Sequence, residues 1–372
     1  MYGVDMGPDL VDVVVVGGGQ AGLATGFYLQ RSGLVPGRDV VILDASDRPG
    51  GAWPRTWEGL RLFSPAGYSS LPGWMMPPWD DATRGYPPRD HVVDYLTRYE
   101  QRYGLQVQRL QRVESVSRAD DDPLGRLLVT AGDRTWAARA VVSATGTWER
   151  PFWPAYAGMR EYVGRQLHAA DYRVPEDFAG QHVVVVGGGN SAAQVLAEVS
   201  TVAETTWVTA RRPRFLPDDV DGRVLFATAR ARISALEQGR EHAGVAGLGD
   251  IVMVASVKDA RERGVLRALP MFARLDRDGV VWADGRRQDC DAVIWCTGFR
   301  PALRHLRPLG LHAHDGHVRV GGPSGTAALD EPRVHLVGYG DWTGPASATL
   351  AGVGPSAKAT AAAIAERVSA AA

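Results

Sequence analysis

Two glycine-rich turns carry the clearest chemical signal in this sequence. Gly17–Gly22 (GGGQAG) follows the apolar run Val13–Val16, and Gly187–Ala192 (GGGNSA) follows a near-copy of that run at Val183–Val186. In the pattern G-x-G-x-x-G/A the first glycine permits a tight turn, the second admits a diphosphate, and the small third residue lets a helix pack on the strand. The N–H groups at the start of that helix favour phosphate. The sequence therefore predicts two dinucleotide sites.

The residues that end the second strand of each unit predict which nucleotide each site binds. Asp44 follows the expected strand 39–43, 27 positions after Gly17. A carboxylate there accepts hydrogen bonds from a ribose 2′-OH and repels a 2′-phosphate. In the second unit Arg211 and Arg212 stand at the corresponding place, 24 positions after Gly187. Paired guanidinium groups can hold a 2′-phosphate, so we expect NADPH there; two surface arginines without a ligand are the alternative.

The C-terminal segment indicates that the first site holds FAD. Gly340-Asp341 closes an apolar strand, where the carboxylate can accept hydrogen bonds from ribityl hydroxyls. The turn 343–347 then opens a helix, whose N-terminus favours negative charge at the N1/C2 edge of a reduced flavin. A chain whose end returns to complete the first unit implies that the FAD domain is interrupted.

The elements that position these residues alternate strand and helix, which predicts an α/β fold of two Rossmann-like domains. We expect the NADPH-binding domain, 156–289, to be inserted into an FAD-binding domain made of 1–155 and 290–372. Strand patterns also occupy 106–116, and 89–103 reads as a helix. The basic, helix-compatible segment 222–239 is interpreted as a solvated face.

Composition excludes several classes of function. The 372 residues carry a formal net charge of −1, so neither nucleic acid nor an acidic membrane surface is an expected partner. No apolar run approaches the length of a membrane span, and the N-terminus lacks the basic start of a signal peptide, so we expect a cytoplasmic protein. Cys290 and Cys296 are interpreted as free thiols, and no spacing indicates a metal site or a C-x-x-C redox pair. A homodimer is left open.

Four motifs resemble those of the class B flavin-containing monooxygenases, which are two-dinucleotide-binding flavoproteins. The signature F-x-G-x-x-x-H-x-x-x-[YF] is matched by Tyr162–Tyr172, with Tyr162 in place of the usual Phe. Tyr172 at its last position resembles the members that oxidise nitrogen and sulfur. The other three motifs are similar to the family's G-G-x-W, A-T-G and T-G-[FY]-x-P segments: Pro49–Trp53, Ala144–Trp148 and Cys296–Pro301.

The resemblance and the two turns together define the expected binding residues. His168 of the signature is expected to position the NADPH domain, and no side chain is assigned a catalytic role because the chemistry is centred on the flavin. For FAD we expect Gly17, Gly19, Gln20, Ala21, Gly22, Asp44, Gly51, Trp53, Val113, Thr145, Gly146 and Asp341. For NADPH we expect Gly187, Gly189, Asn190, Ser191, Arg211 and Arg212.

The resemblance implies a reaction as well. NADPH would reduce FAD, and O2 would form a flavin C4a-hydroperoxide that transfers one oxygen atom to a small molecule with a soft nucleophilic atom: sulfur, nitrogen, selenium or trivalent arsenic. LRLFSPAGYSSLPGW with YPPRDHVVDYL is similar to flavin monooxygenases of bacterial arsenic-resistance operons. Many family members place Asn over the flavin near Leu62–Pro65, where this chain has none.

Two alternatives from other classes are kept. A reductase of the thioredoxin- or ferredoxin-reductase type would pass electrons to an external acceptor without inserting oxygen. A flavin-dependent sensor would bind nucleotides without turnover. In the monooxygenase, the aromatic loop 53–79 is expected to wall the substrate pocket, although core packing would explain its aromatic residues equally well.

Overall fold

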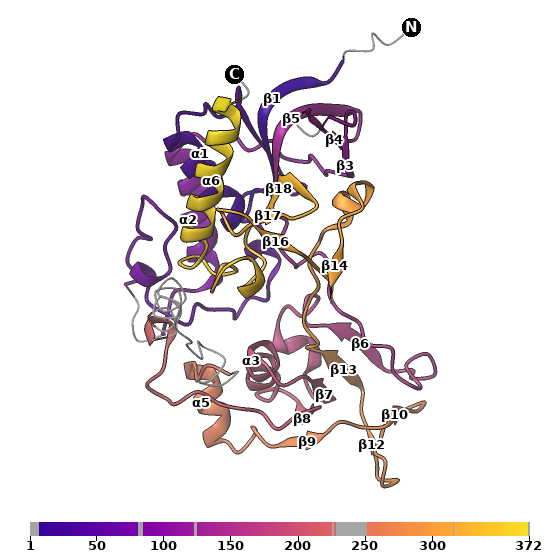
Figure 1. The fold of residues 1–372 in the computed structure, drawn as a ribbon. Helices are drawn as coiled ribbons and strands as arrows, with labels where there is room; N and C mark the ends of the chain where they lie inside the picture. The colour runs from indigo at the N-terminus through magenta and orange to yellow at the C-terminus, as the bar shows by residue number, and fades with distance from the viewer. Residues whose placement is uncertain are drawn as a thin grey trace, which may run out of the picture.

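The computed structural model describes residues 7–80, 85–122, 125–224, 227, 251–314 and 316–370. Two lobes are visible, each built around a largely parallel sheet (Figure 1). The chain leaves the first lobe after β5 (Arg134–Ser143), builds the second lobe, and returns to pair β18 (Glu331–Leu336) beside β5. The α/β class with two dinucleotide-binding units is therefore confirmed.

The first sheet has the order β16-β17-β18-β5-β1-β2, and β1 is parallel to both of its neighbours. Alternate valines of β1 face opposite sides, Val13 and Val15 toward one hydrophobic cluster and Val14 and Val16 toward another. This explains the unbroken apolar run, because a parallel strand is buried on both faces. The other strands of this sheet are β1 (Asp9–Val16), β2 (Val40–Leu43), β3 (Ser115–Arg118), β4 (Leu127–Ala131), β16 (Val320–Gly321) and β17 (Ala327–Ala328).

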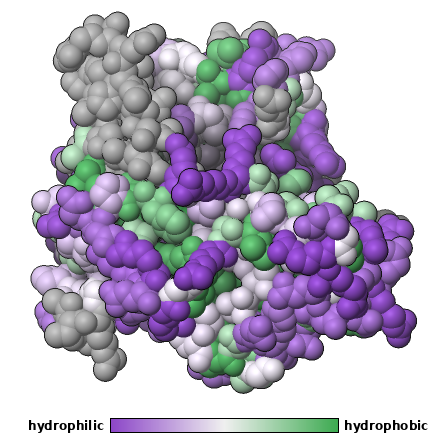
Figure 2. All heavy atoms as spheres, turned by 90° about the horizontal axis from the view of Figure 1, so that it is seen from below, coloured by the Kyte–Doolittle hydropathy of each residue, from purple (hydrophilic) through white to green (hydrophobic). Residues whose placement is uncertain are grey.

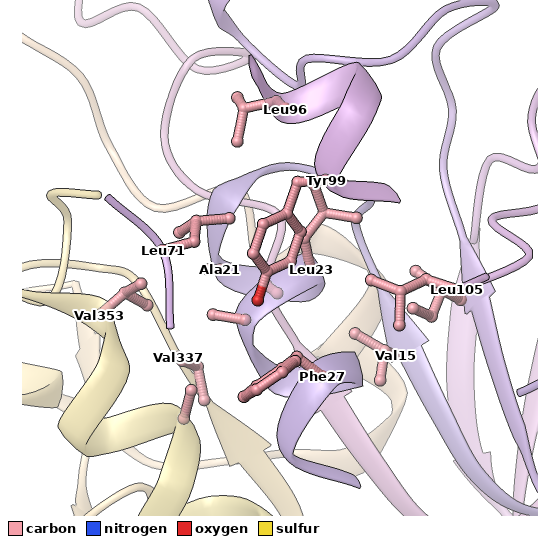
Figure 3. Close-up of a cluster of buried hydrophobic side chains, with 14 of the residues drawn as sticks. Val15, Ala21, Leu23, Phe27, Leu71, Leu96, Tyr99, Leu105, Val337 and Val353 are labelled. Atoms are coloured by element: carbon pink, nitrogen blue, oxygen red, sulfur yellow. The ribbon is translucent and has the colours of Figure 1, made fainter. Parts of the chain in front are cut away.

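Three helices cover one face of this sheet: α1 (Gln20–Arg31), α2 (Arg89–Arg102) and α6 (Val353–Ala370). α1 and α6 lie side by side although they come from opposite ends of the chain. Figure 3 shows Phe27 of α1, Tyr99 of α2 and Val353 of α6 within one cluster of buried side chains. Packing against α2, α6 and the sheet thus holds α1, which follows the first glycine turn, in place.

The second sheet, β6-β13-β7-β8-β9, is entirely parallel. Val183 and Val185 of β7 face one cluster with α3, and Val184 and Val186 face another, which repeats the arrangement of β1. Its elements are β6 (Arg165–His168), β7 (His182–Val186), α3 (Asn190–Val199), β8 (Glu204–Thr209), α5 (Ala255–Glu262), β9 (Ala268–Pro270) and β13 (Ala292–Trp295).

Short elements complete the described residues. Two small antiparallel sheets are formed by β10 (Arg274–Leu275) with β11 (Gly279–Val281) and β12 (Arg287–Asp289), and by β14 (Ala313–His314) with β15 (His317–Val318). The 3₁₀ helices are η1 (Trp53–Arg55), η2 (Ala66–Tyr68), η4 (Pro175–Phe178), η6 (Arg304–Leu309) and η7 (Asp341–Thr343).

The strand expected over 106–116 is wrong for most of its length, because Gln106 and Leu110 have φ angles of 50° and 58°, which are incompatible with an extended strand. The helix expected over 222–239 lies largely outside the described residues. β13 pairs with β6 and β7, so the second sheet extends to Trp295, beyond the expected domain boundary at 290.

The chain crosses between the lobes twice, and the two crossings run side by side. Phe152 N–H donates to the carbonyl of Gly298 at 2.9 Å, and Arg300 N–H donates to that of Arg150 at 2.8 Å. Trp148 stacks on Phe299 with ring centroids 5.1 Å apart. This double linker joins the Ala144–Trp148 and Cys296–Pro301 motifs and ties the two glycine-turn units together.

The underside of the molecule, where the second lobe lies, is mostly hydrophilic, with apolar side chains in smaller patches (Figure 2). Among the residues that the structure describes, no helix has both the length and the apolar character needed to cross a membrane.

A substitution at the third glycine tests how the first turn is built. A Cβ at Gly22 would overlap the carbonyl oxygen of Gly17. We expect Gly22→Ala to lower the free energy of unfolding by about 1–3 kcal/mol, the usual cost of overpacking, and to yield protein with less bound flavin. Gly354→Ala is the control, because nothing lies within 4 Å of its Cβ. Thermal unfolding measures the stability of the two variants, and flavin absorbance measures their flavin content. Equal stability and equal flavin content in both variants would contradict this account of the turn.

Candidate active site

A cavity of about 1040 Å³ opens at the carboxyl ends of β1, β2 and β5 in the first lobe. That volume lies at the upper end of the range for ligand sites, and the position is where open α/β sheets bind ligands. The structure brings ten of the twelve residues expected for FAD together around it: Gly17, Gly19, Gln20, Ala21, Asp44, Gly51, Trp53, Val113, Thr145 and Gly146.

The start of α1 is prepared for a phosphate. Gly19 at the N-cap has no side chain to cap the helix, and no acidic residue stands in the first turn. Gly51 packs directly on Gly19, and a Cβ there would lie 2.7 Å from the Gly19 Cα. The first turn of α1 therefore supplies no side chain of its own to neutralise the partial positive charge of its backbone N–H groups. These features fit a dinucleotide diphosphate.

Asp44 is buried at the inner end of this cavity and is held in a fixed orientation. Its carboxylate accepts the N–H of Gly18 at 2.5 Å and that of Ser46 at 2.7 Å. The guanidinium of Arg109 lies 3.6 Å away and is paired in turn with Glu100. The remaining acceptor positions of the Asp44 carboxylate can receive ribose hydroxyls, since an ionised carboxylate has about four.

The lining of this cavity carries more positive than negative side chains. Five arginines (Arg55, Arg112, Arg150, Arg304 and Arg307) line it against three carboxylates (Asp44, Glu114 and Glu149). At the rim, Glu149 accepts from Arg112 at 2.7 Å and from Arg55 at 3.2 Å. Hydrogen bonding to Arg112 lowers the pKa of Glu149, and this carboxylate links three separate segments of the chain. The positive surplus suits a ligand with two phosphates.

Two expected FAD residues do not line the cavity. Gly22 lies behind the turn, against Gly17. Asp341 is exposed in η7, and its carboxylate accepts the N–H of Ala346 at 3.1 Å. The neighbouring Gly338, Tyr339 and Ala348 reach the cavity instead. The Tyr339 hydroxyl is buried and lies 2.7 Å from the Thr145 hydroxyl and 2.6 Å from that of Ser143.

The second unit repeats the first at α3. Gly189 is an N-cap without a side-chain hydrogen bond, and the first turn again lacks an acid. Gly187, Asn190 and Ser191 lie at this helix start; the Asn190 Oδ1 accepts the N–H of Val252 at 2.8 Å. Arg211 and Arg212 follow β8 and are exposed. The register of the two sheets puts Thr209 at the place of Asp44, so the arginines lie two and three residues beyond it.

A shared feature of the two units escaped the sequence analysis. Gly17 and Gly187 have φ angles of 110° and 138°, and each packs against the backbone at the end of its unit's neighbouring strand, Ala144 after β5 and Cys296 after β13. Ala144-Thr145-Gly146 and Cys296-Thr297-Gly298 are therefore equivalent segments. Their common x-T-G letters form a second internal repeat that could have been read from the sequence.

His168 is fully buried at the end of β6, beside the linker. Its Nε2 lies 3.0 Å from the carbonyl oxygen of Gly298, and its Nδ1 accepts the N–H of Ala170 at 3.0 Å. Since Nδ1 accepts a hydrogen, Nε2 carries the proton of a neutral ring. Burial lowers the pKa of His168, in agreement with this neutral form. It also contacts the rings of Trp153 and Phe299 in the linker, and its assignment as a positioning residue stays a prediction.

A smaller cavity, of about 210 Å³, lies between the two units. It shares Gln20, Trp53 and Ala348 with the large cavity, and Asn190, Ser191 and Gln194 of α3 line its other side. The Gln20 amide donates to the Ala348 carbonyl at 2.7 Å and accepts from the Trp53 indole at 3.2 Å. The aromatic-loop expectation is met in part: Trp53, Trp57 and Phe63 line this cavity, whereas Trp74 packs on Tyr95 and Trp79 on His91.

The chain resembles known proteins along most of its length. The sequence model of the pyridine nucleotide-disulphide oxidoreductase family matches residues 14–260. The solved flavin-containing monooxygenase from Stenotrophomonas maltophilia is 52% identical, covers 97% of this chain and 99% of its own, and superposes with a TM-score of 0.84. The chain belongs to the flavin monooxygenases of this oxidoreductase family. Its cofactors are FAD and NADPH.

Two curated relatives are more distant. An uncharacterized CzcO-like oxidoreductase of Geobacillus kaustophilus is 29% identical over 78% of this chain and 81% of its own length. Indole-3-pyruvate monooxygenase YUCCA1 of Oryza sativa is 28% identical over 77% of this chain and 76% of its own. Both similarities extend over more than three quarters of this chain.

Asp44 lines the large cavity of this flavin monooxygenase and Asp341 does not, so substitutions at the two positions test whether that cavity holds FAD. We expect Asp44→Ala to weaken FAD retention by about tenfold or more, because a buried carboxylate that receives ribose hydroxyls is lost. Asp341→Ala should lower retention less, because the Asp341 carboxylate lies outside the lining, where it accepts the N–H of Ala346. Flavin content after dialysis and FAD titration of the apoprotein measure both. The assignment fails if Asp44→Ala retains FAD as the wild type does.

Proposed function

We propose that this flavin monooxygenase takes its hydride from NADPH and inserts one oxygen atom of O2 into a soft nucleophilic atom of a small molecule: sulfur, nitrogen or trivalent arsenic. The observation that carries the proposal is the small cavity, which lies where the two nucleotide units meet and shares three residues with the large one. Trivalent arsenic rests on the sequence resemblance alone.

The reaction balances with one equivalent of each reagent. Substrate, NADPH, H⁺ and O2 yield the oxygenated substrate, NADP⁺ and H2O. Bound FAD supplies hydride acceptance and the activation of O2. The chain's own residues bind the two nucleotides, orient them and exclude water.

The lining of the small cavity supports oxygen transfer to a soft nucleophile. Its walls are largely apolar and aromatic, and among the described residues that line it Arg61 is the one charged side chain. Such a transfer needs no general acid–base pair from the protein, and a dry, apolar pocket protects reactive intermediates from water. The same lining gives no support to a disulfide reductase, because neither cysteine is part of it.

The domain division and the nucleotide contacts are part of this proposal. We assign the FAD-binding domain to residues up to 155 and to those that follow β13, and the NADPH-binding domain to the sheet between them. The residues lining the large cavity hold FAD. Gly187, Gly189, Asn190 and Ser191 contact the NADPH diphosphate, and Arg211 with Arg212 contacts the 2′-phosphate. His168 and Gly298 keep the linker between the domains in place.

Isotopic labelling tests the reaction itself. With a simple thioether such as methyl phenyl sulfide, NADPH and ¹⁸O2, we expect one labelled oxygen in the sulfoxide for each NADPH consumed in productive turnover. Mass spectrometry of the product and a peroxide assay give the two yields. NADPH oxidation that produces only H2O2, or that requires an added electron acceptor, would support the reductase alternative instead.

Arg211→Ala tests the assignment of the second site to NADPH. We expect KM for NADPH to rise about tenfold or more, since a charge-assisted contact to the 2′-phosphate is lost, while KM for NADH changes little. Arg274→Ala, another exposed arginine of the second lobe, is the control and should change neither. Steady-state kinetics with both nucleotides decide; an equal rise for NADH would remove Arg211 from the phosphate site.

A further inference from the structure

We infer that Trp57 is a specificity-determining wall of the small cavity and that Glu198, a partly buried carboxylate on α3, is the positioning residue that holds it there. This inference rests on the proposed function, because it takes the small cavity as the place where the substrate is oxygenated. It assigns a role to two residues that neither the sequence motifs nor the nucleotide sites account for.

Trp57 lies in the N-terminal segment that builds the first lobe, but its side chain is buried in the hydrophobic cluster of the second lobe. It is 5% exposed and packs in the hydrophobic cluster of the second lobe, with its ring centroid 6.4 Å from that of Tyr172. The next residue reinforces the connection, since the N–H of Glu58 donates to the carbonyl of Arg173 at 3.0 Å. One edge of Trp57 nevertheless lines the small cavity. The same side chain thus anchors the two lobes and shapes the pocket.

Glu198 fixes the orientation of this indole. Its Oε1 accepts the Trp57 Nε1–H at 3.0 Å, and its Oε2 accepts the Tyr172 hydroxyl at 2.9 Å. Gly59 packs so closely on the carboxylate that a Cβ there would overlap it. Within the described residues no Lys, Arg or His forms an ion pair with Glu198, so two neutral donors satisfy it.

Packing alone does not account for Glu198, because a partly buried carboxylate without a cationic partner costs free energy. Burial raises the pKa of Glu198, which reflects the cost of placing a carboxylate away from water. An apolar side chain would fill the same space at lower cost but would leave the indole N–H without an acceptor. The arrangement therefore serves to hold Trp57 in one orientation.

The position of Glu198 on α3 connects this orientation to the nucleotide unit. Asn190, Gln194 and Glu198 are spaced by four residues and lie along one face of the helix. The first two line the small cavity, and Glu198 continues the same face to the Trp57 indole. The helix that offers its N-terminus to NADPH thus also sets the opposite wall of the pocket.

The test compares two thioethers that differ only in size, methyl phenyl sulfide and n-butyl phenyl sulfide, on FAD-loaded protein. The measured quantity is kcat/KM for the methyl compound divided by kcat/KM for the butyl compound. The wild type should prefer the methyl compound, because the cavity measures about 210 Å³. Trp57→Phe, which shortens the wall, and Glu198→Ala, which frees the indole, should each lower this ratio about tenfold, with KM for NADPH within about twofold of the wild type.

Tyr172→Phe is the matched control. It also removes a hydrogen bond from Glu198 in the same core but leaves the bond to Trp57, so the ratio should change less than about threefold. Glu198→Gln can still accept the indole N–H through its Oε1 and should behave like this control. If Glu198→Ala does not fold, Glu198→Met replaces it, because it keeps the volume and still removes the acceptor.

The outcomes separate this inference from the function on which it rests. Suppose that the wild type oxygenates both thioethers and that Glu198→Ala or Glu198→Met keeps the wild-type ratio. The inference is then overturned, and the proposed function stands. If Tyr172→Phe shifts the ratio as much as they do, Glu198 acts through general core stability and the inference fails. A wild type that oxygenates neither thioether would overturn the proposed function, and the inference with it.

Discussion

The unpaired backbone N–H groups at the start of two helices are the feature around which this molecule is built. Gly19 and Gly189 occupy the N-cap positions of α1 and α3, where a Ser or Asp would normally satisfy those groups. Leaving them free costs stability unless a ligand completes them, and a diphosphate does so with both charge and geometry. The largely parallel sheets, the positive-φ glycines Gly17 and Gly187 and the burial of β1 and β7 hold these helix ends in place.

The second constraint is that two such helix ends must face a common space. The double linker between 144–152 and 296–302 joins the lobes through backbone hydrogen bonds and the stacked rings of Trp148 and Phe299. On the other side of the junction, Gln20 connects Trp53 with Ala348 at the boundary of the two cavities. Trp57 crosses from the first lobe into the core of the second. The linker and Trp57 hold the two lobes together at separate places, while Gln20 fixes residues of the first lobe at the edge of the small cavity.

The parts of the fold that were predictable from sequence are those dictated by strong local patterns. Val13–Val16 and Val183–Val186 could be read as buried parallel strands, and each glycine turn indicated a helix directly after its strand. Asp44 was found for the same reason, because its place is fixed by the end of β2. The strand at 106–116 was misread because an alternating pattern does not reveal the positive φ angles of Gln106 and Leu110.

The residues that could not be predicted meet only through tertiary packing. Glu198 lies 141 positions from Trp57, and nothing local in either segment indicates that they pair. Tyr339 is buried against Thr145 across 194 positions. Asp341 shows the opposite case, because a sensible local argument placed its carboxylate at the cavity and the turn of η7 directs it to the Ala346 N–H instead. Sequence patterns locate backbone elements well, but the direction of a loop side chain depends on neighbours that the pattern does not contain.

The central claim is that one chain holds two dinucleotides at once, in separate sites of different charge preference. Calorimetric titration of the purified chain with FAD and then with NADP⁺ tests this most directly. The account predicts one FAD and one NADP⁺ for each chain, with NADP⁺ binding to the FAD-loaded protein without displacing the flavin. A single nucleotide for each chain, or NADP⁺ that competes with FAD for the same site, would contradict it.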